Sequence, residues 1–409
     1  MPLKQILLST AACLVLSSCG GSSGGLQLSE GGIGGTGISV GSITAFGSIW
    51  VNGVRYDVSQ ADFVRDGVSA PGQSAYRIGE VVTITGSVNT DGVSGTAQTV
   101  EFKDVLEGTV SQVSTDGSTI EVLGQTIHAD ALTVFHGFGL LSDLQLGNVL
   151  EISGVYDAQG MIRASSITLK QPVFISGESM LEVKGRVSEL RPDAKTFLLG
   201  QLLVDYSLAD LSDLSGDLAA GQYVEVESEL ALQVGILLAS KVETEDEYTV
   251  FESGQEVELE GLVTQFTSAD QFSVNGQPVI SDANTRFEKG TAADIQLNSF
   301  IEVEGYINHL GVLVADEISV KQASTTETSE VEGRITAFDW DANELTVQGT
   351  TVVVDNSTIL LDETSETEYS IRFSDLRVND FIEVKGTALV SGKLLALRID
   401  RELEEEEDE

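Results

Sequence analysis

The sequence predicts an all-β protein: a tandem array of about five small five-stranded β-barrels, each with a short helical crossover. Two observations predict this fold class. Four short signals recur in the same order along the chain, roughly 70 residues apart, which indicates internal repeats. One of these signals alternates apolar and polar residues, which is typical of a β-strand with one buried face.

The first two signals indicate a strand that leads into a tight hairpin. The first is a Gly-x-Val/Ile step, which begins at Gly41, Gly108, Gly185, Gly261 and Gly333. The second is a short apolar strand ending in glycine, at Gly53, Gly124, Gly200, Gly276 and Gly349. Because glycine adopts positive φ without strain, such a strand end predicts a tight turn.

The third and fourth signals indicate the last two strands of each unit. The third is the alternating strand, VVTITG (81–86), VLEISG (149–154), FIEVEG (300–305) and FIEVKG (381–386); YVEVES (223–228) ends instead in Ser228. The fourth is Gly-x-x-x-Ala-x-x-Ile/Val, which ends at Ile167, Val242, Ile318 and Ile399. Repeat 1 departs from the fourth signal and keeps only Ala97 and Val100.

A variable stretch with spaced leucines separates the second and third signals, as in LLSDLQLG (140–147). We interpret it as a short helix or helical turn, so that three strands, a crossover and two strands form an OB-like Greek-key barrel. An open β-sandwich with the same strand count is the alternative. The repeats, numbered 1 to 5, are expected at 38–103, 104–170, 180–243, 256–321 and 330–401, followed by an acidic tail at 402–409.

The charge of the chain restricts its partners. The 409 residues include 22 Lys+Arg and 64 Asp+Glu, for a formal net charge of −42. Such a surface repels nucleic-acid phosphates and anionic lipids, so we expect no nucleic-acid partner. With 41% hydrophobic residues, the chain can nevertheless bury cores.

The N-terminus predicts a lipoprotein signal peptide at 1–18. Lys4 precedes an apolar run that is too short to span a bilayer, and Leu16-Ser17-Ser18-Cys19 follows it in the manner of a bacterial lipobox. We expect lipidation of Cys19, and a Gly/Ser-rich tether at 19–37. Because Gly20 follows the cysteine, we expect the outer membrane of a Gram-negative bacterium, with the periplasmic or surface-facing side left open.

The chain resembles a known family of bacterial proteins. The run GIGGTGISVGSITAFGSIWVNGVRYD (32–57), the run LEGTVSQVSTDGSTIEVLGQTIHAD (106–130) and the third and fourth signals are similar to those of envelope lipoproteins built from tandem copies of domain of unknown function 5666. Repeat 3 departs most, at Ser228. The resemblance implies a location in the cell envelope and an architecture of tandem domains, and it implies no activity.

Candidate catalytic, cofactor and metal residues are few. The imidazoles available to activate a nucleophile are His128, His136 and His309, and only His136, in a variable insertion, is a functional candidate. The stretch from Asp339 to Glu344 begins like a calcium loop but lacks its glycine and closing glutamate, so we interpret it as a hairpin tip. We therefore expect no catalytic residue, cofactor or metal site.

One set of acids recurs at a single repeat position: Glu151, Glu225, Glu302 and Glu383. We interpret them as the polar, outward face of half-buried strands, with a cation-attracting ladder as the alternative. The favoured function is a non-enzymatic, lipid-anchored scaffold or binding module for a protein or glycan partner. The alternative is a calcium-responsive adhesion or matrix module that uses the acidic surface.

Overall fold

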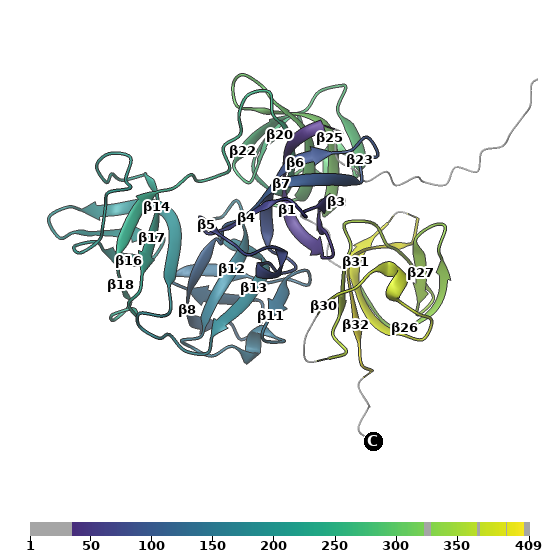
Figure 1. The fold of residues 1–409 in the computed structure, drawn as a ribbon, viewed down its shortest axis with the longest axis horizontal. Helices are drawn as coiled ribbons and strands as arrows, with labels where there is room; N and C mark the ends of the chain where they lie inside the picture. The colour runs from purple at the N-terminus through teal and green to yellow at the C-terminus, as the bar shows by residue number, and fades with distance from the viewer. Residues whose placement is uncertain (1–34, 323–328, 366–368, 390, 405–409) are drawn as a thin grey trace, which may run out of the picture.

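The computed structural model describes residues 35–322, 329–365, 369–389 and 391–404, and it is an all-β structure of several small barrels (Figure 1). Within these residues the helical elements are 3-10 turns of three residues each: Gln73–Ala75, Leu141–Asp143, Ala292–Asp294 and Phe373–Asp375. None of the described helices is long and apolar enough to cross a membrane.

The predicted helical crossovers are wrong, and the second repeat shows why. After Leu141–Asp143 the chain extends, and Gly147 turns it with φ of 89° into the next strand. Leu141 and Leu144 are both buried, so the leucine spacing that resembles a helix comes from one 3-10 turn that anchors two side chains. A stretch this short offers no room for a stable α-helix.

Repeat 2 shows the barrel circuit. Its strands are β8 (Leu106–Val113), β9 (Thr119–Val122), β10 (Gln125–His128), β11 (Val134–His136), β12 (Val149–Tyr156) and β13 (Ile162–Gln171). Pairing runs β8-β9-β10-β13-β12 and returns to β8, which closes a five-stranded barrel. The short strand β11 lies parallel to β13 in the crossover, where a helix was expected.

The same circuit closes in three other repeats. Repeat 1 contains β1 (Gly35–Ala45), β2 (Ile49–Val51), β3 (Val54–Asp57), β4 (Asp62–Arg65), β5 (Val68–Ser69), β6 (Val81–Val88) and β7 (Ser94–Phe102). Repeat 4 contains β20 (Glu256–Ser268), β21 (Gln271–Val274), β22 (Gln277–Ile280), β23 (Arg286–Lys289), β24 (Phe300–Ile307) and β25 (Leu313–Gln322). Repeat 5 contains β26 (Ser329–Asp339), β27 (Glu344–Val347), β28 (Thr350–Val353), β29 (Ile359–Asp362), β30 (Tyr369–Ser370), β31 (Phe381–Ala388) and β32 (Leu394–Glu402).

Repeat 3 departs at its last strand. Its elements are β14 (Leu181–Arg191), β15 (Thr196–Leu199), β16 (Leu202–Asp205), β17 (Tyr223–Ser228), β18 (Ile236–Leu238) and β19 (Lys241–Thr244). The last strand is broken in two: β18 pairs with β16, and β19 pairs with β17.

The closing glycine of the third signal and the alanine of the fourth signal form one structural feature. Gly154 lies opposite Ala164, and Gly305 lies opposite Ala315, each beside a β-bulge. A Cβ on Gly305 would lie 1.9 Å from the Val314 carbonyl oxygen, and one on Gly154 would lie 2.2 Å from that of Arg163. Glycine is therefore required because the two backbones approach closely. Where Ser228 replaces it, β17 ends.

The first two signals also meet in space. Asn275 and Gly276 both have positive φ, 47° and 83°, as a type I′ hairpin turn requires. The Asn275 amide bridges the first strand: its Nδ2 donates to the Glu260 carbonyl at 3.1 Å, and its Oδ1 accepts from the Leu262 amide at 2.9 Å. A Cβ on Gly261 would lie 2.1 Å from Nδ2, so the Gly-x-Val step makes room for the hairpin.

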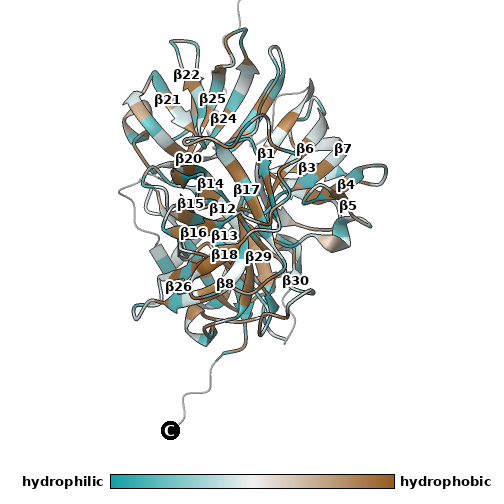
Figure 2. Ribbon diagram, turned by 90° about the vertical axis from the view of Figure 1, so that its left-hand side faces the viewer, coloured by the Kyte–Doolittle hydropathy of each residue, from teal (hydrophilic) through white to brown (hydrophobic). Residues whose placement is uncertain are grey.

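The barrels are not five separate bodies, so the expected count of five is not supported. The strand β1 pairs in parallel with β20, so that repeats 1 and 4 share a sheet of 13 strands, and β8 pairs with β14 in the antiparallel direction, so that repeats 2 and 3 share one of 12. Repeat 5 forms a sheet of 7 strands by itself. The buried apolar residues form four clusters, one of which spans repeats 2 and 3. Figure 2 shows apolar segments along the strands, alternating with polar ones.

We predict that Gly305→Ala destabilises the protein by about 2–3 kcal/mol, because the added methyl group must displace a backbone carbonyl rather than a flexible side chain. Urea unfolding followed by circular dichroism measures the change. The control is Gly185→Ala, where a Cβ would lie an ordinary 3.6 Å from Leu199, and there we expect unchanged or slightly higher stability. Equal losses for the two variants would contradict the close-approach explanation.

Candidate functional site

The residues singled out from the sequence lie apart from one another. Cys19 lies outside the described residues. His136 is packed between repeats 1 and 2, where its Nε2 lies 2.8 Å from the Ile78 carbonyl oxygen, and burial lowers its pKa to about 4. His128 is half-buried on β10, where burial and then Arg163 lower its pKa. His309 is exposed in the turn between β24 and β25.

The stretch that resembles a calcium loop is a hairpin tip, as predicted. The strand β26 ends at Asp339 and β27 begins at Glu344. The Asp339 Oδ1 accepts a hydrogen bond from the Ala342 amide at 3.2 Å, and the Glu344 carboxylate forms an ion pair with Lys393. These acids stabilise the turn and the adjoining strand.

The recurring strand acids are where the structure corrects the sequence most. Glu151 and Glu302 are buried, and Glu225 and Glu383 are half-buried, so they do not form an outward, solvated face. All four form ion pairs. Glu151 pairs with Arg65 and Lys170, and Glu302 pairs with Lys321. Glu225 pairs with Lys184, and Glu383 pairs with Lys385. The interpretation of these acids as an outward, solvated face fails at Glu151 and Glu302 because a second repeat covers the outer face of the sheet there.

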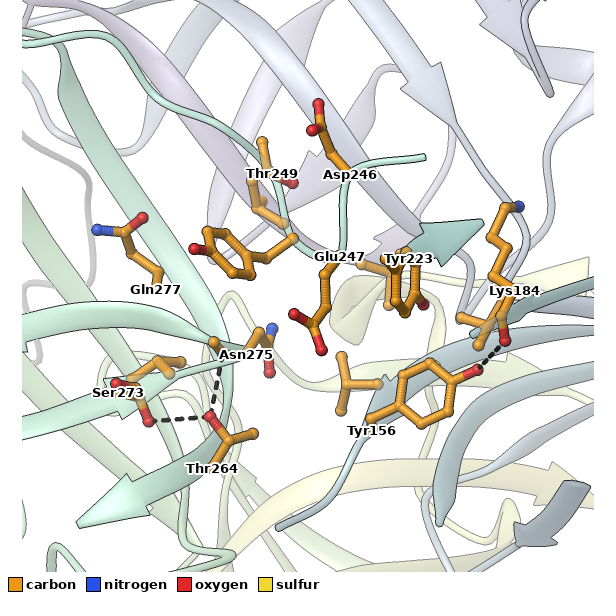
Figure 3. A pocket seen from close by; sticks show the side chains of 18 of the residues that line it. Tyr156, Lys184, Tyr223, Asp246, Glu247, Thr249, Thr264, Ser273, Asn275 and Gln277 are labelled. Atoms are coloured by element: carbon orange, nitrogen blue, oxygen red, sulfur yellow. Dashed lines mark hydrogen bonds between the residues drawn. The ribbon is translucent and has the colours of Figure 1, made fainter. Parts of the chain in front are cut away.

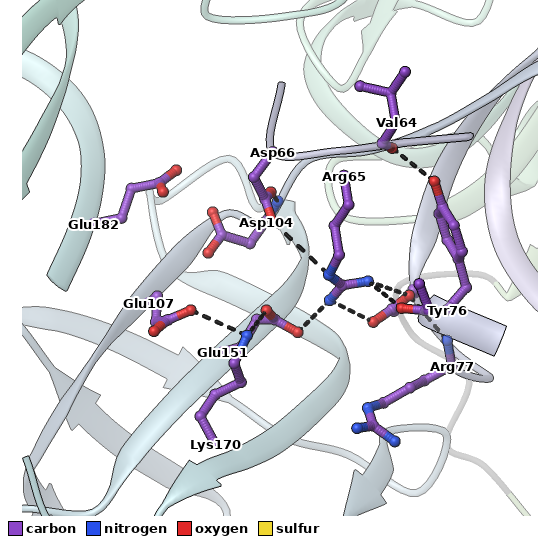
Figure 4. A network of polar contacts seen from close by, with 12 residues as sticks. Val64, Arg65, Asp66, Tyr76, Arg77, Asp104, Glu107, Glu151, Lys170 and Glu182 are labelled. Carbon is purple, nitrogen blue, oxygen red and sulfur yellow. Dashed lines mark hydrogen bonds and ion pairs between the residues drawn. The ribbon is translucent and has the colours of Figure 1, made fainter. Parts of the chain in front are cut away.

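Repeats 1 and 2 meet at a network of ion pairs around Arg65 (Figure 4). The Arg65 guanidinium lies 2.9 Å from Glu80 of its own repeat, and it also forms an ion pair with Glu151 of repeat 2. It lies 4.0 Å above the Phe102 ring, and Lys170 approaches Glu151 and, at 3.3 Å, Glu107. A ring against one face of the side chain and carboxylates along its edge suit arginine, because its guanidinium is planar and donates several hydrogen bonds in that plane.

A second buried cation joins repeats 2 and 3. The Lys184 Nζ donates to the Asp104 carbonyl oxygen at 2.9 Å and to its carboxylate at 3.2 Å, and it contacts Glu182 at 2.5 Å. Burial lowers the pKa of an isolated lysine, but these carboxylates outweigh that effect and raise the pKa of Lys184. The lysine therefore stays charged and holds the linker between the two repeats.

The candidate site is a central cavity of about 1160 Å³, walled by repeats 1 to 4 (Figure 3). Repeat 2 supplies the β12–β13 turn, repeat 3 supplies Lys184 and Tyr223, and repeat 4 supplies the β21–β22 hairpin with Asn275. The segment from Glu245 to Phe251, which joins repeats 3 and 4, forms a further wall. The cavity exists only because the four repeats assemble around it.

Tyrosines, amides and carboxylates line this cavity. The Tyr156 hydroxyl donates to the Lys184 carbonyl oxygen at 3.4 Å, and burial raises the pKa of Tyr223 to about 12. Tyr248 is 43% exposed, and its ring lies against the hairpin turn at Gly276. The ionisable lining residues are six acids and three cations: Glu101, Asp104, Asp157, Glu245, Asp246, Glu247, Lys103, Lys184 and Arg186.

The cations of the lining are already paired. Lys103 lies 3.0 Å from Glu245, Arg186 forms an ion pair with Glu247, and Lys184 is held as described above. The cavity therefore offers carboxylates, side-chain amides and hydroxyls, and it disfavours an anionic ligand. Donors and acceptors of this kind, beside aromatic rings, can hold a neutral, hydroxyl-rich molecule.

Sequence reasoning missed this site because its residues come from four repeats and one linker. The available signal was Tyr248, an aromatic residue in the acidic linker ETEDEYTVFES (243–253), between the expected repeats 3 and 4. A partly exposed tyrosine among acids suits a binding surface. Nothing in the sequence, however, indicates which hairpins face it.

The chain is thus a multi-barrel protein with a cavity between its repeats, and one known domain family matches part of it. The domain of unknown function DUF5666 matches three segments, 107–168, 260–319 and 332–400. The chain thus carries tandem copies of this domain, within repeats 2, 4 and 5. Repeat 1, which departs from the fourth signal, and repeat 3, which lacks the closing glycine, lie outside these segments. No curated protein matches the chain.

We predict that the protein gains stability on acidification from pH 7.5 to 5.5. Burial is the main cause that raises the pKa of both Glu225 and Glu402 to about 7, and it also raises the pKa of Glu80. Between the unfolded value of about 4.3 and these folded values the native state binds more protons, so its stability falls as pH rises. His136 and His128 oppose the effect, since their folded pKa values are lowered, but they are two groups against several.

Thermal unfolding in EDTA at the two pH values measures this, and we expect a melting temperature a few degrees higher at pH 5.5. The variant Glu225→Gln removes one titrating group and should show a smaller difference. A melting temperature that falls on acidification would contradict the prediction.

Proposed function

We propose that the protein is a non-enzymatic binding module of the bacterial cell envelope, and that its central cavity takes a neutral glycan. The observation that carries the proposal is the cavity itself, which is larger than the ~300–1,000 Å³ typical of small-ligand sites and so has room for several sugar rings. In OB-type barrels the loop between the fourth and fifth strands contributes to oligosaccharide binding. In repeat 2 that loop, between β12 and β13, lines the cavity.

The composition of the lining supports a glycan over other ligands. Side-chain amides of Gln125, Gln159 and Gln277 and carboxylates such as Asp246 can engage neighbouring sugar hydroxyls as donors and acceptors. Tyr248 supplies an apolar ring face with a polar hydroxyl. Six acids against three paired cations disfavour anionic sugars.

The proposal of a non-enzymatic role rests on the positions of the titratable groups. In the described part of the chain, none of the three histidines lines the cavity. Acids are abundant there, but three of them are held by Lys103, Lys184 and Arg186 rather than arranged as a free pair.

We predict that Tyr248→Ala weakens glycan binding about tenfold, equivalent to ~1.4 kcal/mol, because the ring that covers bound sugar is lost. An array of neutral oligosaccharides probed with the purified protein, followed by calorimetric titration of the strongest hit, measures the affinity. The matched control is Tyr306→Ala in repeat 4, since Tyr306 is equally exposed at 45% but lies away from the cavity. Binding of oligolysine in place of any glycan would contradict the proposal.

We further propose that a lipid on Cys19 anchors the protein to the membrane, in the outer membrane of a Gram-negative bacterium. The support is the lipobox-like Leu16-Ser17-Ser18-Cys19 after a short apolar run, with Gly20 following.

We predict that Cys19→Ala abolishes incorporation of an alkyne-labelled fatty acid and moves the protein from the membrane pellet to the soluble fraction. Click labelling and cell fractionation measure the two effects. Ser18→Thr, which keeps the cysteine, serves as the control. Labelling that persists in the alanine variant would contradict the proposed anchor.

A further inference from the structure

A buried carboxylate lies at the seam between repeats 1 and 4, where β1 pairs in parallel with β20. Glu258 is only 5% exposed, and its Oε2 accepts a hydrogen bond from the Ser39 hydroxyl at 2.6 Å. The Ser39 hydroxyl also lies 2.6 Å from the Tyr56 hydroxyl. Because Ser39 donates its one proton to Glu258, Tyr56 is the donor in the hydrogen bond between Tyr56 and Ser39. This relay orients one oxygen of Glu258 and leaves the other, Oε1, without a hydrogen-bond partner.

Two further buried acids lie beside Glu258. Glu304 lies directly opposite Glu258 on β24, and Glu302 is the next residue on the same face. Ligand oxygens of the three carboxylates lie within 4.8 Å of one another. The nearby Lys321 Nζ lies 2.9 Å from Glu302, and all three carboxylates are buried. Buried charge of this kind requires a compensating cation or proton.

A small cavity touches the same residues. It is about 20 Å³ in volume and is lined by Ser39, Tyr56 and Glu258 among others. That volume exceeds the ~10–15 Å³ that one water molecule needs, so there is room beside Glu258 for a water ligand.

We propose that a divalent cation of the Ca²⁺ class binds Glu258, Glu302 and Glu304 of repeat 4, beside the seam at which Ser39 of repeat 1 contacts Glu258. Carboxylate oxygens are the ligands that hard cations prefer, and oxygens on opposite sides of Ca²⁺ lie about 5 Å apart, twice its bond length of ~2.3–2.6 Å. The observed spacing within 4.8 Å suits that ion. The Ser39–Tyr56 relay holds Glu258 in place for it.

Two other groups of three acids are instead neutralised by neighbouring cations. In Asp104, Glu107 and Glu151, the carboxylates are neutralised by Lys184, Lys170 and Arg65. In Glu225, Glu227 and Glu243, Lys184 and Lys241 do the same. Among the three acid groups of the described residues, the one at the seam between repeats 1 and 4 contains Glu258, whose buried Oε1 has no hydrogen-bond partner.

The test is a titration of the purified, EDTA-treated full-length protein with Ca²⁺, followed by thermal unfolding. Ligand that binds only the folded state raises the melting temperature, so we expect a saturable rise of several degrees. Tb³⁺ serves as a luminescent substitute for Ca²⁺, and the Tyr56 phenol beside the site is positioned to sensitise it. We expect Tb³⁺ luminescence that Ca²⁺ displaces.

The variant Glu258→Gln should lose both responses, whereas Glu225→Gln, in a neutralised acid group, should keep both. If Glu258→Gln folds poorly, Glu304→Gln tests the same site and leaves the ion pair between Lys321 and Glu302 intact. Absence of a metal response in the wild-type protein would show that protons alone neutralise the seam and would overturn the proposal. An undiminished response in both site variants would assign the effect to the general acidic surface and would also overturn it. Neither result bears on glycan binding in the central cavity.

Discussion

The first strands of different repeats pair with one another, and this pairing sets which barrels lie side by side. Each of these strands is long and already serves two neighbours in its own barrel, and β1 and β8 add a third by pairing with β20 and β14. Backbone groups at a sheet edge must find partners, and here a second repeat supplies them. Joined in this way, repeats distant in sequence lie side by side, as repeats 1 and 4 do (Figure 1).

This pairing explains why so much charge is buried in an acidic protein. Where one barrel packs against another, the polar side chains at the contact are covered, and each acid there needs a cation. Lys184 meets that need where repeats 2 and 3 share a sheet, and Arg65 meets it where repeat 1 packs against repeat 2, which belongs to a different sheet. Because a buried ion pair contributes little net stability but is costly to mismatch, these pairs favour one arrangement of the repeats over others. At the seam between repeats 1 and 4, the buried Oε1 of Glu258 has no hydrogen-bond partner, which is why we propose a bound ion there.

The central cavity follows from the same assembly. Its walls combine strand residues, such as Tyr156 on β12 and Tyr223 on β17, with turns and the linker at 245–251, and they lie outside the barrel interiors, which apolar side chains fill. Tyr248 lies on that linker and is partly exposed, so it can contact a ligand without belonging to a barrel core. A substitution at Tyr248 should therefore change binding far more than stability.

Local features were predictable from the sequence to a large extent. Gly-x-Val steps, hairpin glycines and alternating strands mark places where the backbone turns or where two backbones approach closely. Gly261, Gly276 and Gly305 occupy such places within one barrel. The helical crossover was not predictable, because spaced leucines such as Leu141 and Leu144 fit both a helix and a 3-10 turn that leads into an extended segment. The candidate site was still less accessible, since Tyr156, Tyr223 and Tyr248 lie far apart in the chain.

The all-β class, the tandem repeats and the positions that require glycine could be read from the sequence, because each depends on residues close in the chain or paired within one barrel. The joining of strands from different repeats, the burial of the acids and the position of the cavity emerge only from the folded chain. A period of two assigns side chains to the two faces of a strand but leaves open what covers the second face. For Glu151 and Glu302 the answer is another repeat rather than water.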